Sequence, residues 1–297
     1  MSFTAEVKTE LTQADISSDS YKKAFAYGFL LCGKSFNSRS ISCTSDYECV
    51  ISIFMRIIYE LTGINPAVSQ QKSGKYVLRI VTSSERKRLI EFFDHSVNEI
   101  SLRINHGNFE DDESYYAFIR GAFLSCGSVS NPDKGYHLEF VIQHNKLCND
   151  LLKILTDLSL GAKYILRKYS HVIYLKGSEN IEDLLTMMGA QNSSLYLMGV
   201  KVQKDVRNKI NRKMNFESAN MSRAIEAGLA QVSAIELIEK KQGLDSLSDE
   251  LKELAVLRKE NPDMSLKELG ASLSVPISRS GVNHRLSKLV NIAEKYK

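Results

Sequence analysis

The sequence predicts an α+β fold in two parts: a duplicated α-β-β-α-β-β-α domain with pseudo-twofold symmetry, followed by an all-α helix-turn-helix domain. Two similar hexapeptides indicate the duplication. They are Gly28–Gly33 (GFLLCG) and Ala122–Gly127 (AFLSCG), which lie 94 residues apart. Short amphipathic segments after residue 245, separated by Asn-Pro-Asp and Ser-Val-Pro, indicate the all-α part.

The elements of the two halves match in kind. Each hexapeptide ends an apolar helical stretch with a glycine, which suits a helix C-terminus. In the first half we expect helices at Tyr21–Gly33, Glu48–Leu61 and Ser84–Asp94, and strands at Arg39–Ser45, Pro66–Gln71 and Lys75–Val81, with a Ser73-Gly74 turn. In the second we expect helices at Tyr115–Gly127, Lys146–Leu158 and Ile181–Met188, and strands at Tyr136–Ile142, Ala162–Tyr169 and His171–Leu175.

Glycines in the first helix of each half predict how the halves pair. Gly28, Gly33, Gly121 and Gly127 permit close approach of two backbones because glycine has no Cβ. The two helices should therefore pack together and form a pseudo-twofold α/β saddle.

Composition indicates an ordinary globular protein. The 297 residues are 43% hydrophobic and 25% charged. No apolar run approaches the roughly 20 residues that span a bilayer, and Met1–Gln13 lacks a secretory signal pattern, so we expect no membrane association and a cytoplasmic protein. Five cysteines without a C-x-x-C pair predict reduced structural thiols, and we expect no metal and no cofactor.

Positive charge is concentrated in the C-terminal third. Residues 1–200 hold 21 Lys and Arg against 22 Asp and Glu, whereas residues 201–297 hold 18 against 13. A basic run in this third would attract a phosphate backbone, although such a run is also typical of a solvated surface. Its members are Lys201, Lys204, Arg207, Lys209, Arg212 and Lys213.

The last fifty residues predict a helix-turn-helix. A long amphipathic helix over Asn215–Gln242 connects to a helix over Asp249–Glu260. Ser265 and Glu268 form a capping box for a helix that ends at Leu273, and Ser278 is the expected N-cap of the last helix. The alternative is a small three-helix bundle with a solvated polar face.

The last helix has one apolar and one polar face. Val282, Leu286 and Leu289 have the spacing of a buried face. The opposite face carries groups that bind base edges and phosphates when a helix lies in the major groove of double-stranded DNA. With two positions from the preceding helix, the candidate DNA-binding residues are Ser265, Lys267, Ser278, Arg279, Ser280, Asn283, His284, Arg285 and Lys288.

The helix-ending segments Phe25–Gly33 and Ile119–Gly127 resemble the LAGLIDADG motif of homing endonucleases, duplicated in one chain. In that family the residue before the last glycine is an acid that binds the catalytic divalent metal. Cys32 and Cys126 stand at these positions, and a thiol is a poor ligand for Mg²⁺. The resemblance therefore implies a nuclease scaffold without catalytic residues. A redox pair or a soft-metal site is the alternative to buried packing cysteines.

The two parts together resemble the WhiA family of bacterial regulators. The resemblance is carried by Met1–Lys8, Phe118–Leu124, Gly127–Ser130, Asn261–Gly270 and Pro276–Leu286. It implies a DNA-binding transcription factor of Gram-positive bacteria that acts on promoters, associates with the nucleoid, and is linked to cell division, chromosome segregation and, in filamentous members, sporulation. The turn is longer than in the tightest helix-turn-helix forms by Val275-Pro276.

We expect four segments: a first LAGLIDADG-like repeat with an N-terminal arm (1–107), a second repeat (108–200), a basic segment with a connector helix (201–245), and the helix-turn-helix domain (246–297).

One alternative function is that of an active endonuclease. It would use the acidic run Glu110, Asp111, Asp112 and Glu113, which lies at the wrong end of its helix for the active site. The other is an interaction scaffold whose near-neutral saddle binds a protein partner, although Lys75, Arg79, Lys163 and Arg167 would give its strands some positive charge.

Overall fold

The computed structural model describes residues 2–16 and 18–296. Met1, part of the opening motif, and Lys297, the last residue of the expected C-terminal domain, lie outside them, as does Ser17. The chain divides into two compact units, Met1–Lys204 and Asp205–Lys297. Throughout the described ranges, every helix is too short or too polar to cross a membrane.

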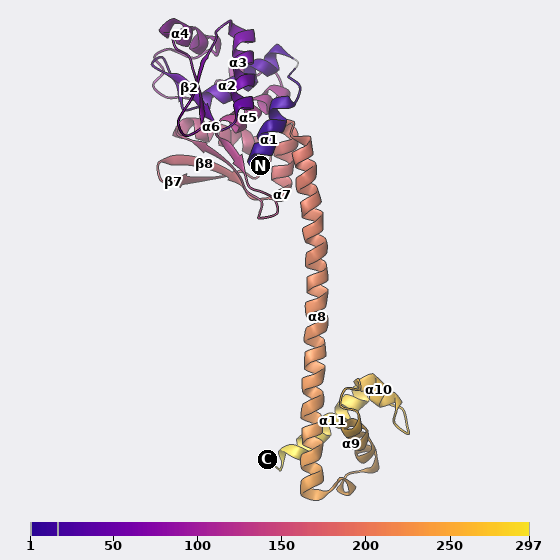
Figure 1. Cartoon of the computed structure of the whole chain (residues 1–297). Helices are drawn as coiled ribbons and strands as arrows, with labels where there is room; N and C mark the ends of the chain where they lie inside the picture. Colours follow the sequence, from indigo (N-terminus) through magenta and orange to yellow (C-terminus); the bar gives the residue numbers. More distant parts are fainter. Residues whose placement is uncertain (1, 17, 297) are drawn as a thin grey trace. The chain divides into compact units, whose positions relative to one another are not determined.

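The first repeat has the predicted order of elements (Figure 1). It consists of α2 (Asp19–Leu31), β1 (Ser35–Phe36), β2 (Ile41–Ser45), α3 (Glu48–Thr62), β3 (Ala67–Gln70), β4 (Tyr76–Arg79) and α4 (Ser83–Phe92). The expected N-terminal arm is a helix, α1 (Phe3–Gln13), with Ser2 as its N-cap.

The second repeat repeats this order. It consists of α5 (Asp112–Cys126), β5 (Gly127–Val129), β6 (Leu138–Ile142), α6 (Asn145–Asp157), β7 (Lys163–Arg167), β8 (Ser170–Leu175) and α7 (Ser178–Met188). A short 3-10 helix, η1 (His106–Asn108), lies in the connection between the repeats.

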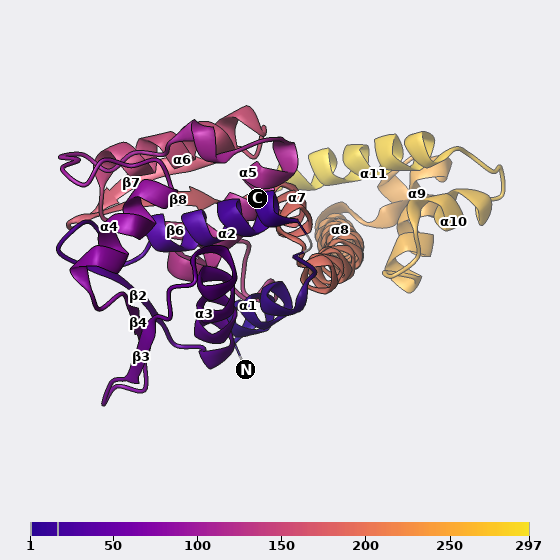
Figure 2. The same ribbon diagram turned by 90° about the horizontal axis from the view of Figure 1, so that it is seen from above.

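Each repeat contains a four-stranded antiparallel sheet with an equivalent strand order, β1-β2-β4-β3 and β5-β6-β8-β7. Cys43 pairs with Leu78 in the first sheet and Phe140 with Ile173 in the second, and all four side chains are fully buried. Because side chains alternate along a strand, these pairs mark the face of each sheet that packs on helices. In the second repeat α6 covers β6 and β8 (Figure 2).

The helices α2 and α5 pack with their backbones in contact. A Cβ at Gly28 would lie 2.0 Å from the carbonyl oxygen of Phe118, and a Cβ at Gly121 would lie 2.0 Å from that of Phe25. Only glycine fits at either position, as the sequence predicted. Gly33 and Gly127 do not take part: a Cβ at Gly33 would meet the Cys43 sulfur, and one at Gly127 would meet the Phe123 ring.

A buried arginine fastens α1 to this pair of helices. The Arg120 side chain, on α5, is 1% exposed and donates to the carbonyl oxygens of Leu11 and Ala14 at the end of α1 and to the Tyr21 hydroxyl. Its guanidinium also lies 5.1 Å from the centroid of the Phe25 ring. The carbonyl groups left free at the end of α1 thus find charged donors.

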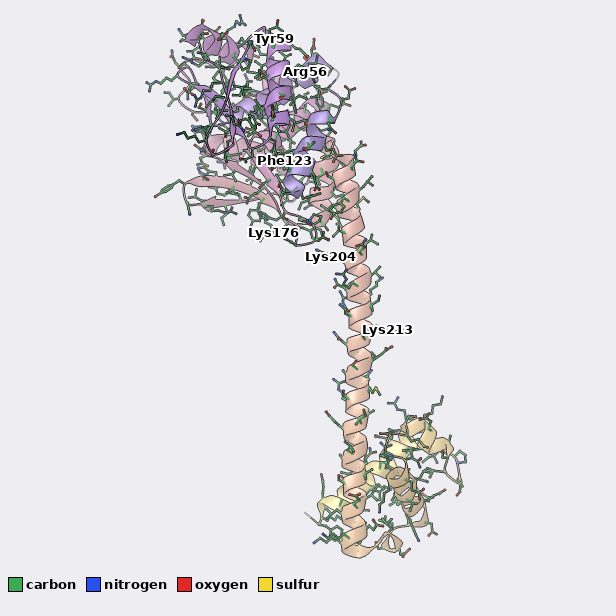
Figure 3. All side chains as sticks on the ribbon, viewed as in Figure 1. Arg56, Tyr59, Phe123, Lys176, Lys204 and Lys213 are labelled. Carbon is green, nitrogen blue, oxygen red and sulfur yellow. The ribbon has the colours of Figure 1, made fainter. Side chains whose placement is uncertain are left out.

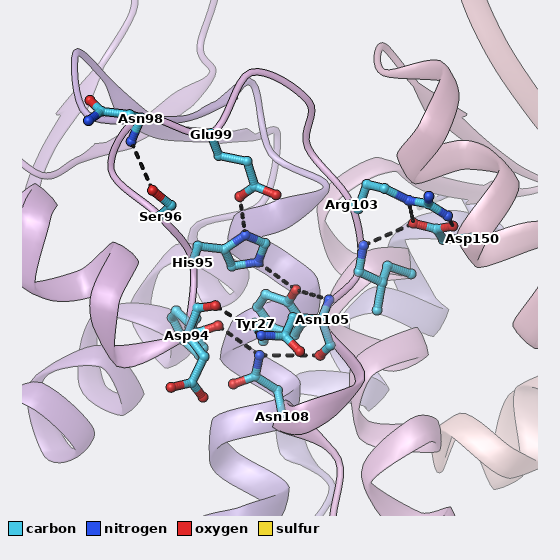
Figure 4. A network of polar contacts seen from close by, with 12 residues as sticks. Tyr27, Asp94, His95, Ser96, Asn98, Glu99, Arg103, Asn105, Asn108 and Asp150 are labelled. Carbon is cyan, nitrogen blue, oxygen red and sulfur yellow. Dashed lines mark hydrogen bonds and ion pairs between the residues drawn. The ribbon is translucent and has the colours of Figure 1, made fainter.

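The connection between the repeats is held by a polar network around Tyr27 (Figure 4). The Tyr27 hydroxyl accepts the Asn105 backbone N–H at 2.8 Å and lies 2.7 Å from Nε2 of His95. Nδ1 of His95 lies 2.5 Å from the Glu99 carboxylate. Asp150, on α6, accepts from Arg103 and from the Ile104 N–H, which ties the same connection to the second repeat.

A single helix, α8 (Gln191–Gln242), follows α7. It begins at Gln191 instead of the predicted Asn215, so the basic run is helical. Leu197 and Val200 are buried in the first unit. In the second unit the helix is followed by η2 (Leu244–Ser246), α9 (Asp249–Glu260), α10 (Leu266–Ala271) and α11 (Arg279–Glu294).

We expect Gly121→Ala to lower the free energy of unfolding by at least about 2 kcal/mol, because the added methyl overlaps a backbone carbonyl that cannot move alone. Denaturant unfolding of the full chain measures this. Gly199→Ala is the matched control, since a Cβ there meets nothing within 4 Å, and it should stabilise α8 by about 0.5–1 kcal/mol. Equal effects of the two substitutions would contradict this view of the α2–α5 contact.

Candidate nucleic-acid interface

The second unit has a small core of its own, to which α8, α9, α10 and α11 all contribute (Figure 1). Ile235 and Ile238 of α8 are fully buried beside Leu254 of α9, Leu269 of α10 and Val282 of α11. The core of the helix-turn-helix therefore includes residues that precede position 246.

The starts of α10 and α11 are capped as the sequence predicted. Ser265 and Glu268 form a capping box, and the Ser278 hydroxyl accepts the Gly281 N–H at 3.3 Å. Each serine oxygen thus satisfies a backbone donor at its helix start. The Ser280 hydroxyl lies 2.9 Å from that of Ser278.

The turn is held from both sides. A Cβ at Gly270 would lie 2.4 Å from the Ile277 carbonyl oxygen, so α10 and the end of the turn are in close contact. The Glu253 carboxylate, on α9, accepts both the N–H and the hydroxyl of Ser274 at 2.6 Å, and these hydrogen bonds hold the pKa of Glu253 below its usual range. The helix α10 ends at Ala271, earlier than the predicted Leu273.

The two faces of α11 are separated as expected. Val282, Leu286 and Leu289 are at most 1% exposed. The candidate residues Arg279, Ser280, Asn283, His284 and Lys288 on the polar face are all exposed. Lys267 and Ser265 are exposed on α10 and at its start.

Arg285 differs from the other candidates on α11. Its guanidinium lies 2.7 Å from the Glu250 carboxylate of α9, and its side chain is 22% exposed. Because α9 already supplies a partner, Arg285 ties α11 to α9 within the unit.

The basic run of α8 falls into two groups. Lys201 pairs with Glu179 at 2.9 Å, and Lys204 donates to the Pro132 carbonyl at 2.6 Å and lies over the Tyr136 ring, so both contact the first unit. Arg207, Lys209, Arg212 and Lys213 belong to the second unit and are exposed. Lys213 is 4.0 Å from Glu217 and projects from α8 (Figure 3).

The ends of α2 and α5 bring Cys32 and Cys126 together. Cys32 is the C-cap of α2 and Cys126 is the last residue of α5, and both line the same cavity. Asp111 caps the other end of α5, with Asp112 and Glu113 in its first turn. Because α5 has 15 residues, roughly 22 Å of helix separates this acidic run from the thiols.

The basic residues on the strands are partly neutralised. Arg167 lies 3.1 Å from Glu139, and Lys75 lies 3.5 Å from Asp46. Arg79 pairs with Ser42 in the sheet register and Lys163 with Tyr174, and both are exposed.

Comparison with known proteins decides the family. Two family models match, the WhiA LAGLIDADG-like domain over residues 115–207 and the WhiA C-terminal HTH domain over residues 210–293. A probable cell division protein WhiA of Clostridium tetani is 36% identical over 99% of this chain and 98% of its own, and one of Clostridium perfringens is 36% identical with the same coverage. The chain belongs to the WhiA family.

A solved WhiA structure has the same fold. The full-length WhiA of Thermotoga maritima matches with a TM-score of 0.61 and 24% identity, covering 100% of this chain and 99% of that one. The expected segment limits at 107, 200 and 245 remain predictions. The two compact units divide between Lys204 and Asp205, inside α8.

Sequence reasoning missed one residue that supports this WhiA helix-turn-helix. Arg258, on α9, is 3% exposed, and it donates to the Gln231 side chain on α8 at 3.0 Å and to the Met264 carbonyl at 2.6 Å. Burial lowers its pKa. A Cβ at Gly228 would lie 2.8 Å from the same guanidinium, so the absence of a side chain at this position of α8 makes room for Arg258. The sequence shows only an arginine near a helix end.

We expect Arg258→Ala to destabilise the second unit by about 2–4 kcal/mol, because it empties a buried position and leaves two acceptors without their donor. Hydrogen exchange of amides in α9, α10 and α11 should accelerate while exchange in α2 and α5 is unchanged. The neighbouring Lys259→Ala, which removes an exposed ion pair with Glu239, is the control and should cost about 0–1 kcal/mol. A loss no larger than that of the control would contradict the role of Arg258.

Proposed function

We propose that this chain is a sequence-specific DNA-binding transcriptional regulator that acts in cell division and chromosome segregation and, in sporulating species, in sporulation. The observation that carries the proposal is the polar face of α11, which is held by a packed core and is exposed at Arg279 and Asn283. The names of the relatives as cell division proteins support the cellular role.

The chemistry of α11 suits base recognition. Ser278 begins the helix, so Arg279 and Asn283 lie in its first turns, where the recognition helix of a helix-turn-helix contacts bases. Arginine pairs with the O6 and N7 atoms of guanine and asparagine with the N6 and N7 atoms of adenine. Lys267, His284 and Lys288 would then contact phosphates and fix the position of the helix in the groove.

The basic residues of α8 would add contacts that do not depend on sequence. Arg207, Lys209, Arg212 and Lys213 are exposed, and each phosphate contact releases bound cations from DNA. Lys201 and Lys204 contribute less, since both have partners in the first unit. The chain would accordingly reside on the nucleoid in the cytoplasm.

We also propose that the duplicated domain has no nuclease activity. Cys32 and Cys126 stand at the positions where LAGLIDADG homing endonucleases, which this domain resembles, have metal-binding acids. The acidic run at Asp111 serves to cap α5. In its place we propose that this domain binds a protein partner. The ion pairs of Arg167 and Lys75 favour this role, because they reduce the positive charge that a DNA-binding sheet needs.

We expect Arg279→Ala and Asn283→Ala each to weaken binding to a preferred promoter by about 1–3 kcal/mol and to relax the choice of sequence. Lys209→Ala should weaken binding to all DNA equally. It should also reduce the steepness of log affinity against log salt concentration by about 1. Genome-wide mapping of bound sites supplies the promoter. DNA-binding titrations over a range of salt concentrations then give the affinity and its salt dependence. Unchanged promoter affinity of the Arg279→Ala, Asn283→Ala double variant would show that α11 is not the recognition helix.

We expect no site-specific nicking when the full-length protein is incubated with its mapped promoter DNA and Mg²⁺. The physical reason is that two thiols do not supply the oxygen ligands that Mg²⁺ requires. A gel assay that detects single-strand breaks tests this, and Cys32→Asp with Cys126→Asp restores acids at both positions for comparison. Nicking by the unchanged chain would overturn the proposal that it lacks nuclease activity.

A further inference from the structure

Two cysteines from different repeats lie at adjoining helix ends in the first unit. Cys32 ends α2, Cys126 ends α5, and both line the same cavity. The glycine contacts at Gly28 and Gly121 fix the two helices against each other, so this arrangement is part of the packing of the domain. A disulfide requires two cysteines on neighbouring backbone segments, as these are.

A buried lysine lies next to this pair. Lys8, on α1, is 7% exposed, and its ammonium donates to the Leu124 carbonyl at 3.1 Å and lies 5.7 Å from the centroid of the Phe123 ring. Burial lowers the pKa of Lys8 to about 8, although the nearby Cys126 and Asp46 oppose the decrease. The lysine therefore still carries its proton at neutral pH, and it places a positive charge near the pair.

The two cysteines differ in exposure. The neighbouring Cys126 side chain, together with burial, raises the pKa of Cys32 well above its ordinary value, so Cys32 keeps its proton. Cys126 is partly exposed. Both line an open cavity of about 540 Å³ that also contains Lys34, Lys75 and His144. A small molecule can thus approach Cys126 through this opening.

We propose that Cys126 and Cys32 are a covalent modification site, a dithiol that is oxidised to an intramolecular disulfide by a small-molecule disulfide such as oxidised glutathione. The Cys126 thiolate attacks the reagent, forms a mixed disulfide and releases one thiolate. Cys32 then attacks the Cys126 sulfur, its proton passes to the second departing thiolate, and the Cys32–Cys126 bond forms. Two protein thiols are oxidised, and one disulfide is reduced to two thiols.

Neighbouring residues favour this chemistry over a soft-metal site. Among the residues that the structure describes, no three His, Cys, Asp or Glu side chains are placed to hold one metal ion. Cys43 and Cys148 are buried, whereas Cys49 is partly exposed on α3 and provides an internal reference for ordinary thiol reactivity.

The test treats the full-length protein with excess oxidised glutathione, blocks the remaining thiols and maps the peptides without reduction. We expect one linked pair of peptides that contain Cys32 and Cys126. In Cys32→Ser the reaction should stop with one glutathione on Cys126, and in Cys126→Ser neither product should form. Glutathione on Cys49 alone, with no linked peptides in the unchanged chain, would overturn the proposal.

Discussion

The contact between the backbones of α2 and α5 is the constraint on which the first unit depends. At Gly28 and Gly121 each helix lies against a carbonyl oxygen of the other, with no room for a methyl group. Each helix packs on the sheet of its own repeat, so the contact between the helices joins the cores of the two repeats. It also brings the helix ends together, which places Cys32 and Cys126 on the same cavity.

Periodicity predicted the longer elements well, because a face of several turns or alternating positions leaves a clear pattern. Both repeats have the predicted α-β-β-α-β-β-α order, although β1 and β5, with two and three residues, are too short to show alternation. The early start of α8 was missed although Val202, Val206, Ile210 and Met214 recur every four residues and continue the helical spacing before Asn215. The capping box at Ser265 was found because its two residues lie three apart.

Contacts between distant residues could not be found in this way. Local composition gives no sign that Arg285 pairs with Glu250, that Arg258 joins α8 to the turn after α9, or that Lys8 lies near Cys126. Each depends on how helices pack, which the sequence of either segment alone does not encode. Of the candidate DNA-binding residues, the sequence predicted the exposed face of α11 correctly but not the partners of Lys201, Lys204 and Arg285.

The side chain of Arg120 has a consequence for how the chain is made. The helix α1 leaves the ribosome first, yet the donors that satisfy its last carbonyl groups come from a residue more than a hundred positions later. The face of α2 that packs on α5 likewise has no partner until α5 is complete. The first repeat therefore keeps apolar surface exposed until the second repeat has been synthesised. Translation beyond α5 is thus the step that allows the N-terminal half to reach its final packing.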